Sequence, residues 1–179
     1  MKQNRENPFF ETYRTPFGTP PFDQIETEQY EPAFDEGIWQ LDEEVRAIAD
    51  NTELPTFENT IIALERSGKL LDKVISAFFN VLNAEADDEM MDISQRVSPK
   101  LSESSNNIYL NEQLFARVKS VYDRKDELHL PMEDARLLEK TFEAFCARGA
   151  ALGPEEKEKY RKLSSELSLL SLTFDQNAL

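Results

Sequence analysis

Few side chains in this sequence of 179 residues have the chemistry for catalysis or metal binding. His129 is the single histidine and Cys146 the single cysteine. A catalytic zinc site takes three protein ligands from histidine, cysteine and carboxylate side chains, so an isolated histidine is a poor candidate. We predict that His129 lies in a connection, and that Cys146, on the apolar side of a helical pattern, is a buried thiol rather than a nucleophile. We therefore predict no catalytic, cofactor-binding or metal-binding residue in this chain.

The acidic, basic and glycine residues also indicate structure rather than chemistry. Carboxylates in a first helical turn stabilise the helix dipole, so the acidic run at 87–89 predicts a helix start and no cation site. The glycines are too scattered for a phosphate-binding loop; they are Gly18, Gly37, Gly68, Gly149 and Gly153. One basic run is interleaved with glutamates, which predicts a mixed, solvated helix face; it consists of Lys157, Lys159, Arg161 and Lys162.

The charge balance excludes two classes of partner. The chain has 35 acidic and 20 basic side chains and a net charge of -15, which repels phosphate backbones and anionic lipids. We expect no nucleic-acid and no membrane partner. No apolar run approaches the roughly 20 residues of a membrane span, and the first ten residues lack the apolar stretch of a signal peptide. These features predict a cytoplasmic protein.

The hydrophobic periodicity predicts an all-α protein, because no useful length of chain alternates in the two-residue period of a strand. We predict a bundle of about six helices that pack mostly antiparallel because their connections are short. The predicted ranges are 31–50, 56–84, 87–107, 111–124, 131–149 and 154–178. Thr56 and Asn111 are suitable helix caps, Pro154 marks a helix start, and Gly149 marks a left-handed helix end.

An extended arm precedes the helices at residues 1–26, and the helical domain is predicted to cover 27–179. The arm contains four prolines and four phenylalanines and shows no helical or strand period. A merely disordered tail is poor in aromatic residues. We therefore expect the arm to lay its rings into the grooves of a folded surface and to be partly ordered. The sequence leaves open whether that surface belongs to this chain.

The helix predicted at 56–84 organises the others, because apolar residues recur on it in an unbroken heptad pattern from Phe57 to Leu82. Leu71 and Phe78 are expected to be buried in this pattern. Gly68 stands within it, which indicates either a harmless kink or the close approach of a crossing helix. A structure that divided this stretch between separate units would overturn the single-helix interpretation.

The helix predicted at 154–178 carries a second heptad pattern and no stop signal. The pattern consists of Tyr160, Leu163, Leu167, Leu170 and Phe174. We expect this chain to be part of a longer protein, with an apolar patch on this helix that packs against the remainder. Two alternatives stay open: an autonomous helical module that binds a partner helix, and a self-associating coiled coil. The reading frame after Leu179 would distinguish the first interpretation from the other two.

Several segments together resemble the start of thimet-oligopeptidase-like zinc metallopeptidases, in particular the bacterial peptidyl-dipeptidase (dipeptidyl carboxypeptidase) branch, with oligopeptidase A next. The resemblance covers essentially the whole chain, and its specificity comes from spanning several helices and their joints. The segments are NPFFETYRTPFGTPPFDQI, QYEPAFDEG, LPTFENTIIALERSGKLLDKVISAFFNVLNAEADDEM, SPKLSE and ELSLLSLTFDQNAL.

This resemblance implies that the chain is the helical, channel-wall portion of a zinc-dependent peptidase that removes C-terminal dipeptides from oligopeptides. Members of the family are about four times longer and hold one zinc with an H-E-x-x-H helix and a more distant glutamate. None of these ligands can be assigned here, because His129 is the only histidine. The implied partners are oligopeptide substrates and a catalytic half outside this sequence, and the chain alone is expected to be inactive.

Overall fold

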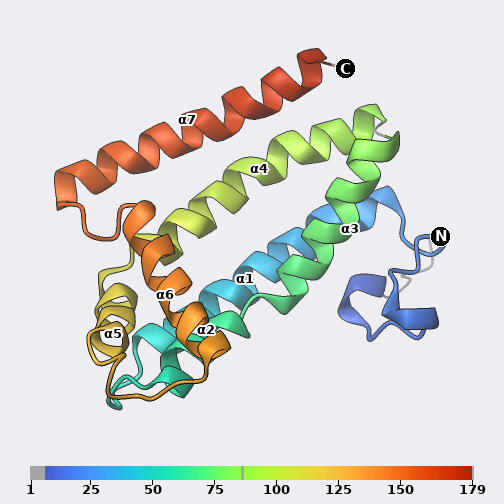
Figure 1. The fold of residues 1–179 in the computed structure, drawn as a ribbon. Helices are drawn as coiled ribbons and strands as arrows, with labels where there is room; N and C mark the ends of the chain where they lie inside the picture. The colour runs from blue at the N-terminus through green and yellow to red at the C-terminus, as the bar shows by residue number, and fades with distance from the viewer. Residues whose placement is uncertain (1–6, 86, 179) are drawn as a thin grey trace. The chain divides into compact units, whose positions relative to one another are not determined.

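The computed structural model describes residues 7–85 and 87–178, in which the regular secondary structure is entirely helical (Figure 1). Six helices of eleven residues or more lie within the described part, which has no strand, and this confirms the predicted all-α class. The helices are α1 (Tyr30–Ala49), α2 (Ala63–Glu65), α3 (Lys69–Glu85), α4 (Asp88–Tyr109), α5 (Glu112–Tyr122), α6 (Met132–Ala147) and α7 (Pro154–Ala178). A π-helical turn, Phe57–Ile62, leads directly into α2, and short 3-10 turns occur at Pro8–Phe10, Pro16–Gly18 and Thr27–Gln29.

The predicted helix ends are confirmed by their backbone geometry. The Asn111 side chain accepts a hydrogen bond from the backbone N–H of Leu114 at 2.9 Å, which caps α5. Thr56 caps the π-helical turn by the same type of bond, with Asn59 as its reciprocal partner. Gly149 has a φ of +88° after α6, as a left-handed helix end requires. These features depend on a few neighbouring residues, and this is why the local sequence predicts them.

The prediction of one continuous central helix is wrong. The chain leaves the helix after α2 in a turn at 66–68, where Gly68 has a φ of +75°, and α3 begins at Lys69. Gly68 therefore acts as a helix stop. Two amphipathic helices placed in phase produce the same heptad spacing as one, so periodicity did not reveal the break.

The described chain forms two compact units. Unit 1 comprises residues 1–41 and 68–98, and unit 2 comprises residues 42–67 and 99–179. The division at 67/68 separates the two halves of the predicted central helix and overturns the single-helix interpretation. The described part of the arm belongs to unit 1, whereas the predicted domain boundary at residue 26 stays a prediction.

The core of unit 1 forms where α1 and α3 pack together. Phe78 of α3 is fully buried and meets Tyr30 and Phe34 of α1 edge-on, with ring centroids 5.1 and 5.2 Å apart. Leu71 and Val74 are buried on the same helix, so the predicted burial of Leu71 and Phe78 is confirmed. In Figure 1, α1 and α3 lie side by side and run in opposite directions.

A glycine permits the close approach of these two helices, although it is Gly37 on α1 rather than Gly68. A Cβ atom at Gly37 would lie 3.0 Å from the Cα and 3.1 Å from the backbone N of Leu71. Backbone atoms cannot rotate out of the way as a flexible side chain can. The two helices can therefore pack at this distance because residue 37 has no side chain.

Gly37→Ala should lower the free energy of unfolding by about 1–3 kcal/mol, because the added methyl group forces the two helices apart. Alanine is ordinarily the better helix former, by about 1 kcal/mol over glycine. Ala47→Gly, at an exposed position of α1, is the control. It should destabilise the protein through the lower helix propensity of glycine alone. Denaturant titration measures both variants, and stabilisation by Gly37→Ala would contradict the close-approach interpretation.

The core of unit 2 is formed by α5, α6 and the π-helical turn. On α5, Leu114, Val118 and Val121 are fully buried. Leu138 and Phe145 of α6 and Ile61 of the π-helical turn are buried in the same unit. Among the described residues, none of the helices combines the length and apolar character of a membrane span.

Candidate functional site

His129 lies where the sequence predicts, in the connection between α5 and α6, and it is exposed. Its Nδ1 atom is 2.7 Å from the backbone oxygen of Glu127. The prediction of a buried thiol at Cys146 is wrong, because Cys146 is exposed. The core side of α6 is occupied by Leu138 and Phe145, and the residue after Phe145 is rotated about 100° around the helix.

The acidic run at 87–89 is a helix start, as predicted. The Asp87 carboxylate accepts a hydrogen bond from the backbone N–H of Met90 at 2.8 Å, and α4 begins at Asp88. Within the part of the chain that the structure describes, no three histidine, cysteine or carboxylate side chains are grouped to hold a metal.

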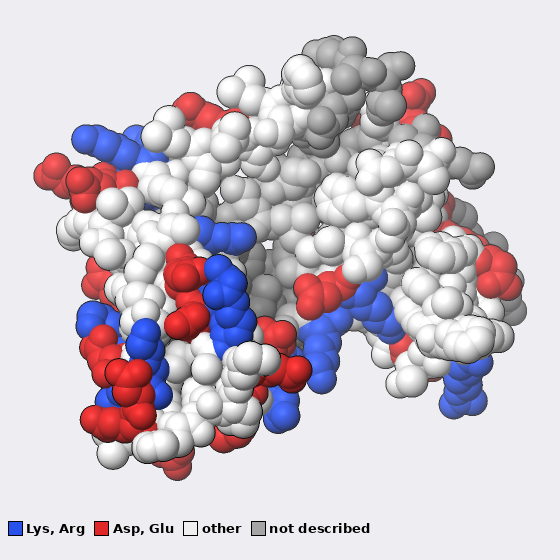
Figure 2. All heavy atoms as spheres, in the orientation of Figure 1, with Lys and Arg blue, Asp and Glu red and all other residues white. Residues whose placement is uncertain are grey.

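The predicted solvated face of α7 needs one correction. Lys157 is buried and donates to the Glu112 carboxylate at 3.1 Å, because its stem packs within unit 2. Elsewhere acidic and basic side chains are interspersed on the face drawn in Figure 2. Lys140 and Glu143 of α6 form an exposed ion pair, and a pair of this kind stabilises the fold only slightly.

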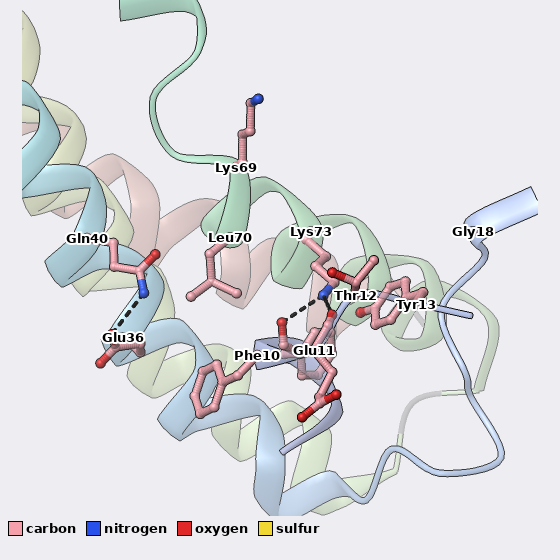
Figure 3. Close-up of a pocket in the computed structure, with 11 residues that line it drawn as sticks. Phe10, Glu11, Thr12, Tyr13, Gly18, Glu36, Gln40, Lys69, Leu70 and Lys73 are labelled. Carbon is pink, nitrogen blue, oxygen red and sulfur yellow. Dashed lines mark hydrogen bonds between the residues drawn. The ribbon is translucent and has the colours of Figure 1, made fainter. Parts of the chain in front are cut away.

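A groove of about 880 Å³ lies in unit 1, and we call it the arm groove. The arm forms one wall, and α1 and α3 form the others (Figure 3). Its lining is Phe9, Phe10, Glu11, Thr12, Tyr13, Gly18, Glu36, Gln40, Lys69, Leu70 and Lys73. Its size is within the usual range for ligand pockets, and its lining mixes apolar, charged and amide groups.

Lys73 of α3 holds the arm in place. Its ammonium group donates to the backbone oxygens of Phe9 at 2.7 Å and Glu11 at 2.6 Å. The same nitrogen lies 3.7 Å from the centroid of the Tyr13 ring, a cation–π contact. Figure 3 shows Lys73 pointing at the arm and Lys69 pointing away from it. Burial lowers the pKa of Lys73, and the neighbouring Glu11 carboxylate opposes this shift.

The arm therefore docks within this chain, which the sequence left open. Phe9 is buried and packs on Tyr30 with ring centroids 5.3 Å apart. The Asn7 side chain donates to the backbone oxygen of Gln29 at 2.8 Å. The prediction that the rings lie in grooves is confirmed for Phe9 alone of the four phenylalanines, since the others are exposed; these are Phe10, Phe17 and Phe22.

Tyr13 contributes an unusual hydroxyl to the arm groove. The hydroxyl is buried and makes no hydrogen bond. Burial, and to a lesser extent the neighbouring Tyr30, raise the pKa of Tyr13 to about 12. The hydroxyl thus stays protonated at neutral pH, and the Lys73 ammonium is occupied by backbone oxygens. This arrangement is suited to holding a chain segment rather than to acid–base catalysis.

Lys73→Met should release the arm, because the change removes both hydrogen bonds and the cation–π contact while keeping most of the apolar stem. We expect amide hydrogen exchange at residues 9–13 to become at least about tenfold faster, as local opening of a segment predicts. Lys69→Met is the matched control, since Lys69 lines the same groove but points away from the arm. Unchanged protection at 9–13 in Lys73→Met would refute the role of Lys73.

A second polar cluster, centred on Arg117 of α5, lies in unit 2 and was not predicted from the sequence. The buried guanidinium donates to the backbone oxygens of Asn51 and Glu53 at 2.5 and 3.0 Å. It also donates to the side chains of Asn59 and Thr60 at 3.1 and 3.3 Å. The sequence does hold a signal, because Arg117 follows Leu114 by three positions and thus lies on the buried face of α5.

These observations define the class of protein as a helical segment with a packed hydrophobic core and a docked N-terminal arm. Its described residues contain no metal-binding cluster. No protein-family profile matches the chain. The chain is 43% identical over 173 residues to dipeptidyl carboxypeptidase of Escherichia coli (strain K12), a match that covers 97% of this chain and 25% of that protein. Dipeptidyl carboxypeptidase of Salmonella typhimurium is 39% identical over the same shares of the two chains.

Oligopeptidase A of E. coli is a more distant relative, 23% identical over 165 residues, which cover 92% of this chain and 24% of that protein. The matches confirm the resemblance seen in the sequence. The chain is homologous to a portion of these peptidases, consistent with the N-terminal part of a thimet-oligopeptidase-like enzyme. It spans about a quarter of the length of the curated relatives it matches.

Proposed function

We propose that this chain is the N-terminal, channel-wall portion of a zinc-dependent peptidyl-dipeptidase that releases C-terminal dipeptides from oligopeptides. The observation that carries the proposal is the 43% identity to a dipeptidyl carboxypeptidase over 97% of this chain. Such identity over nearly the whole chain is far more specific than an all-helical fold, which many unrelated functions share.

The residues of this chain do not fit a catalytic zinc ion. The sequence has one histidine and one cysteine, both of them exposed, and the described part has no cluster of three metal ligands. The zinc and the residues that activate water would therefore belong to sequence outside this chain. The contribution of this chain would be a helical wall that excludes folded proteins and admits short peptides.

The runner-up function is an autonomous helical interaction module. It is compatible with α7, where the side chains of Leu163, Leu167 and Leu170 are each about two-thirds exposed and share one face with Phe174. Exposed apolar patches of this kind mark protein contacts or association. A wall portion also needs such a contact surface, so the patch alone does not separate the two functions.

The proposal predicts a complete difference in activity between two proteins: the 179-residue chain, and the product of the full reading frame from which it comes. With an oligopeptide blocked at its N-terminus, the longer protein should release C-terminal dipeptides and lose this activity to a chelator. The short chain should release none, because its described residues include no group of three side chains that could hold a catalytic metal.

Circular dichroism is the control that both proteins are folded. Peptide cleavage by the short chain would overturn the assignment of catalysis to other sequence. A folded longer protein that releases no dipeptides would remove the peptidase assignment and favour the interaction module.

A further inference from the structure

The arm presents Phe17 in an unusual way. Its backbone φ is 62°, in the left-handed region that bulky residues rarely adopt. Its side chain is fully exposed, with a relative accessibility of 103%. In the described chain, His129 is the one other residue besides glycine with a positive φ. Both the strained backbone and the solvated ring disfavour this conformation in isolation, so it needs an explanation.

A network of hydrogen bonds holds the turn that carries Phe17. The backbone N–H of Gly18 donates to the Thr15 oxygen at 3.0 Å. The Thr19 hydroxyl donates to the Pro16 oxygen at 3.2 Å, and the Thr15 hydroxyl donates to the Thr19 oxygen. Proline at 16 and 20 restricts the backbone further. The turn therefore fixes the position of Phe17, whose ring is exposed to solvent.

The surroundings of Phe17 are typical of a protein contact. Residues 12–24 contain only two charged side chains, Arg14 and Asp23. Phe10 and Phe22 are each about half exposed on the same arm. Aromatic residues with few charges are enriched at the centres of protein interfaces, where they act as anchors. A net charge of -15 argues against phosphate or anionic lipid as the partner.

We propose that Phe17 is an anchor that inserts into an apolar pocket on the part of the longer protein outside these 179 residues. This inference rests on the proposed function. The chain covers 25% of the length of its dipeptidyl carboxypeptidase relatives, so most of the surface in such a protein would come from other sequence. Phe9 and Lys73 already dock the arm up to Tyr13, which leaves the turn at 15–19 to reach that surface.

Phe17→Asn tests the anchor, because asparagine tolerates a positive φ and keeps the turn while removing the ring. The thermal midpoint of the 179-residue chain should stay constant or rise, whereas that of the product of the full reading frame should fall. His129→Asn is the matched control, since it makes the same exchange at the other positive φ without removing an apolar ring. The thermal midpoint of the longer protein should therefore not fall in His129→Asn, as it would on loss of an anchor. The midpoint of the 179-residue chain should show no such effect either.

Hydroxyl-radical footprinting with mass spectrometry then measures exposure of the Phe17 ring directly. Oxidation of Phe17 should be at least about tenfold slower in the longer protein than in the short chain, as burial in an interface pocket predicts. Buried Phe9 is the internal reference. Equal oxidation of Phe17 in both proteins overturns the inference. Protection of Phe17 in the short chain that increases with protein concentration also overturns it, because the ring then binds a second copy of the chain.

Dipeptide release is recorded on the same samples, so the two proposals can fail separately. Protection of Phe17 in a longer protein that lacks peptidase activity supports the anchor and removes the proposed function. An active peptidase in which Phe17 stays unprotected overturns the anchor alone.

Discussion

Phe78→Ala should lower the free energy of unfolding by about 3–5 kcal/mol, the usual cost of truncating a fully buried phenylalanine. The Phe78 ring is fully buried and contacts Tyr30 and Phe34 of α1 and Phe79 of its own helix. Because Tyr30 also packs on Phe9, the loss should spread from the α1–α3 contact to the docked arm.

Denaturant titration monitored by circular dichroism measures this change. Phe78→Leu is a graded variant that keeps most of the apolar volume and should cost less than Phe78→Ala. Glu89→Ala, at an exposed position of the first turn of α4, is the surface control and should change stability by about 0.5 kcal/mol or less. If Phe78→Ala behaved like Glu89→Ala, the core assignment for unit 1 would be wrong.

Arg117→Met should lower the free energy of unfolding by about 2–5 kcal/mol, because it removes the buried guanidinium that donates to Thr60 and to three part-buried oxygens. The guanidinium of Arg117 donates to the backbone oxygens of Asn51 and Glu53, which belong to the loop between α1 and the π-helical turn. Methionine keeps the apolar stem but cannot donate. Hydrogen exchange across residues 51–60 should accelerate together with the loss of global stability.

Arg136→Met is the matched control for this prediction. Arg136 is an exposed arginine of α6 whose ion pair with Glu139 spans 3.6 Å. Exposed pairs of this kind are worth about 0–1 kcal/mol, so this variant should be close to neutral. Equal stability of the two methionine variants would show that the Arg117 cluster does not hold the loop.

A local sequence signal accounts for most of the correct predictions. The all-α class, the helix caps at Thr56 and Asn111 and the left-handed end at Gly149 were predicted correctly, because each depends on residues within a few positions of one another. The heptad pattern also predicted the burial of Leu71 and Phe78. It failed at Gly68, since a regular pattern of apolar residues persists when two amphipathic helices follow each other in phase.

Most contacts of the candidate site could not be predicted from the sequence. Lys73 and the arm residues that it binds are separated by 62 and 64 positions, and Arg117 is 58 to 66 positions from Asn59 and Asn51. Periodicity assigns residues to faces of one helix, and it carries no information about which distant segment covers a face. Lys157 was placed wrongly for the same reason, whereas Cys146 was assigned to the wrong face of α6.

The sequence by itself determined the helical class, the local helix ends and the kinship with dipeptidyl carboxypeptidases, because these depend on short-range backbone preferences or on direct residue identity. Only the tertiary structure decided that the central stretch is divided between two units, that Gly37 rather than Gly68 admits a crossing helix, and that Lys73 docks the arm. Those outcomes follow from the steric and hydrogen-bonding demands of segments far apart in the chain, which exist only once the chain has folded.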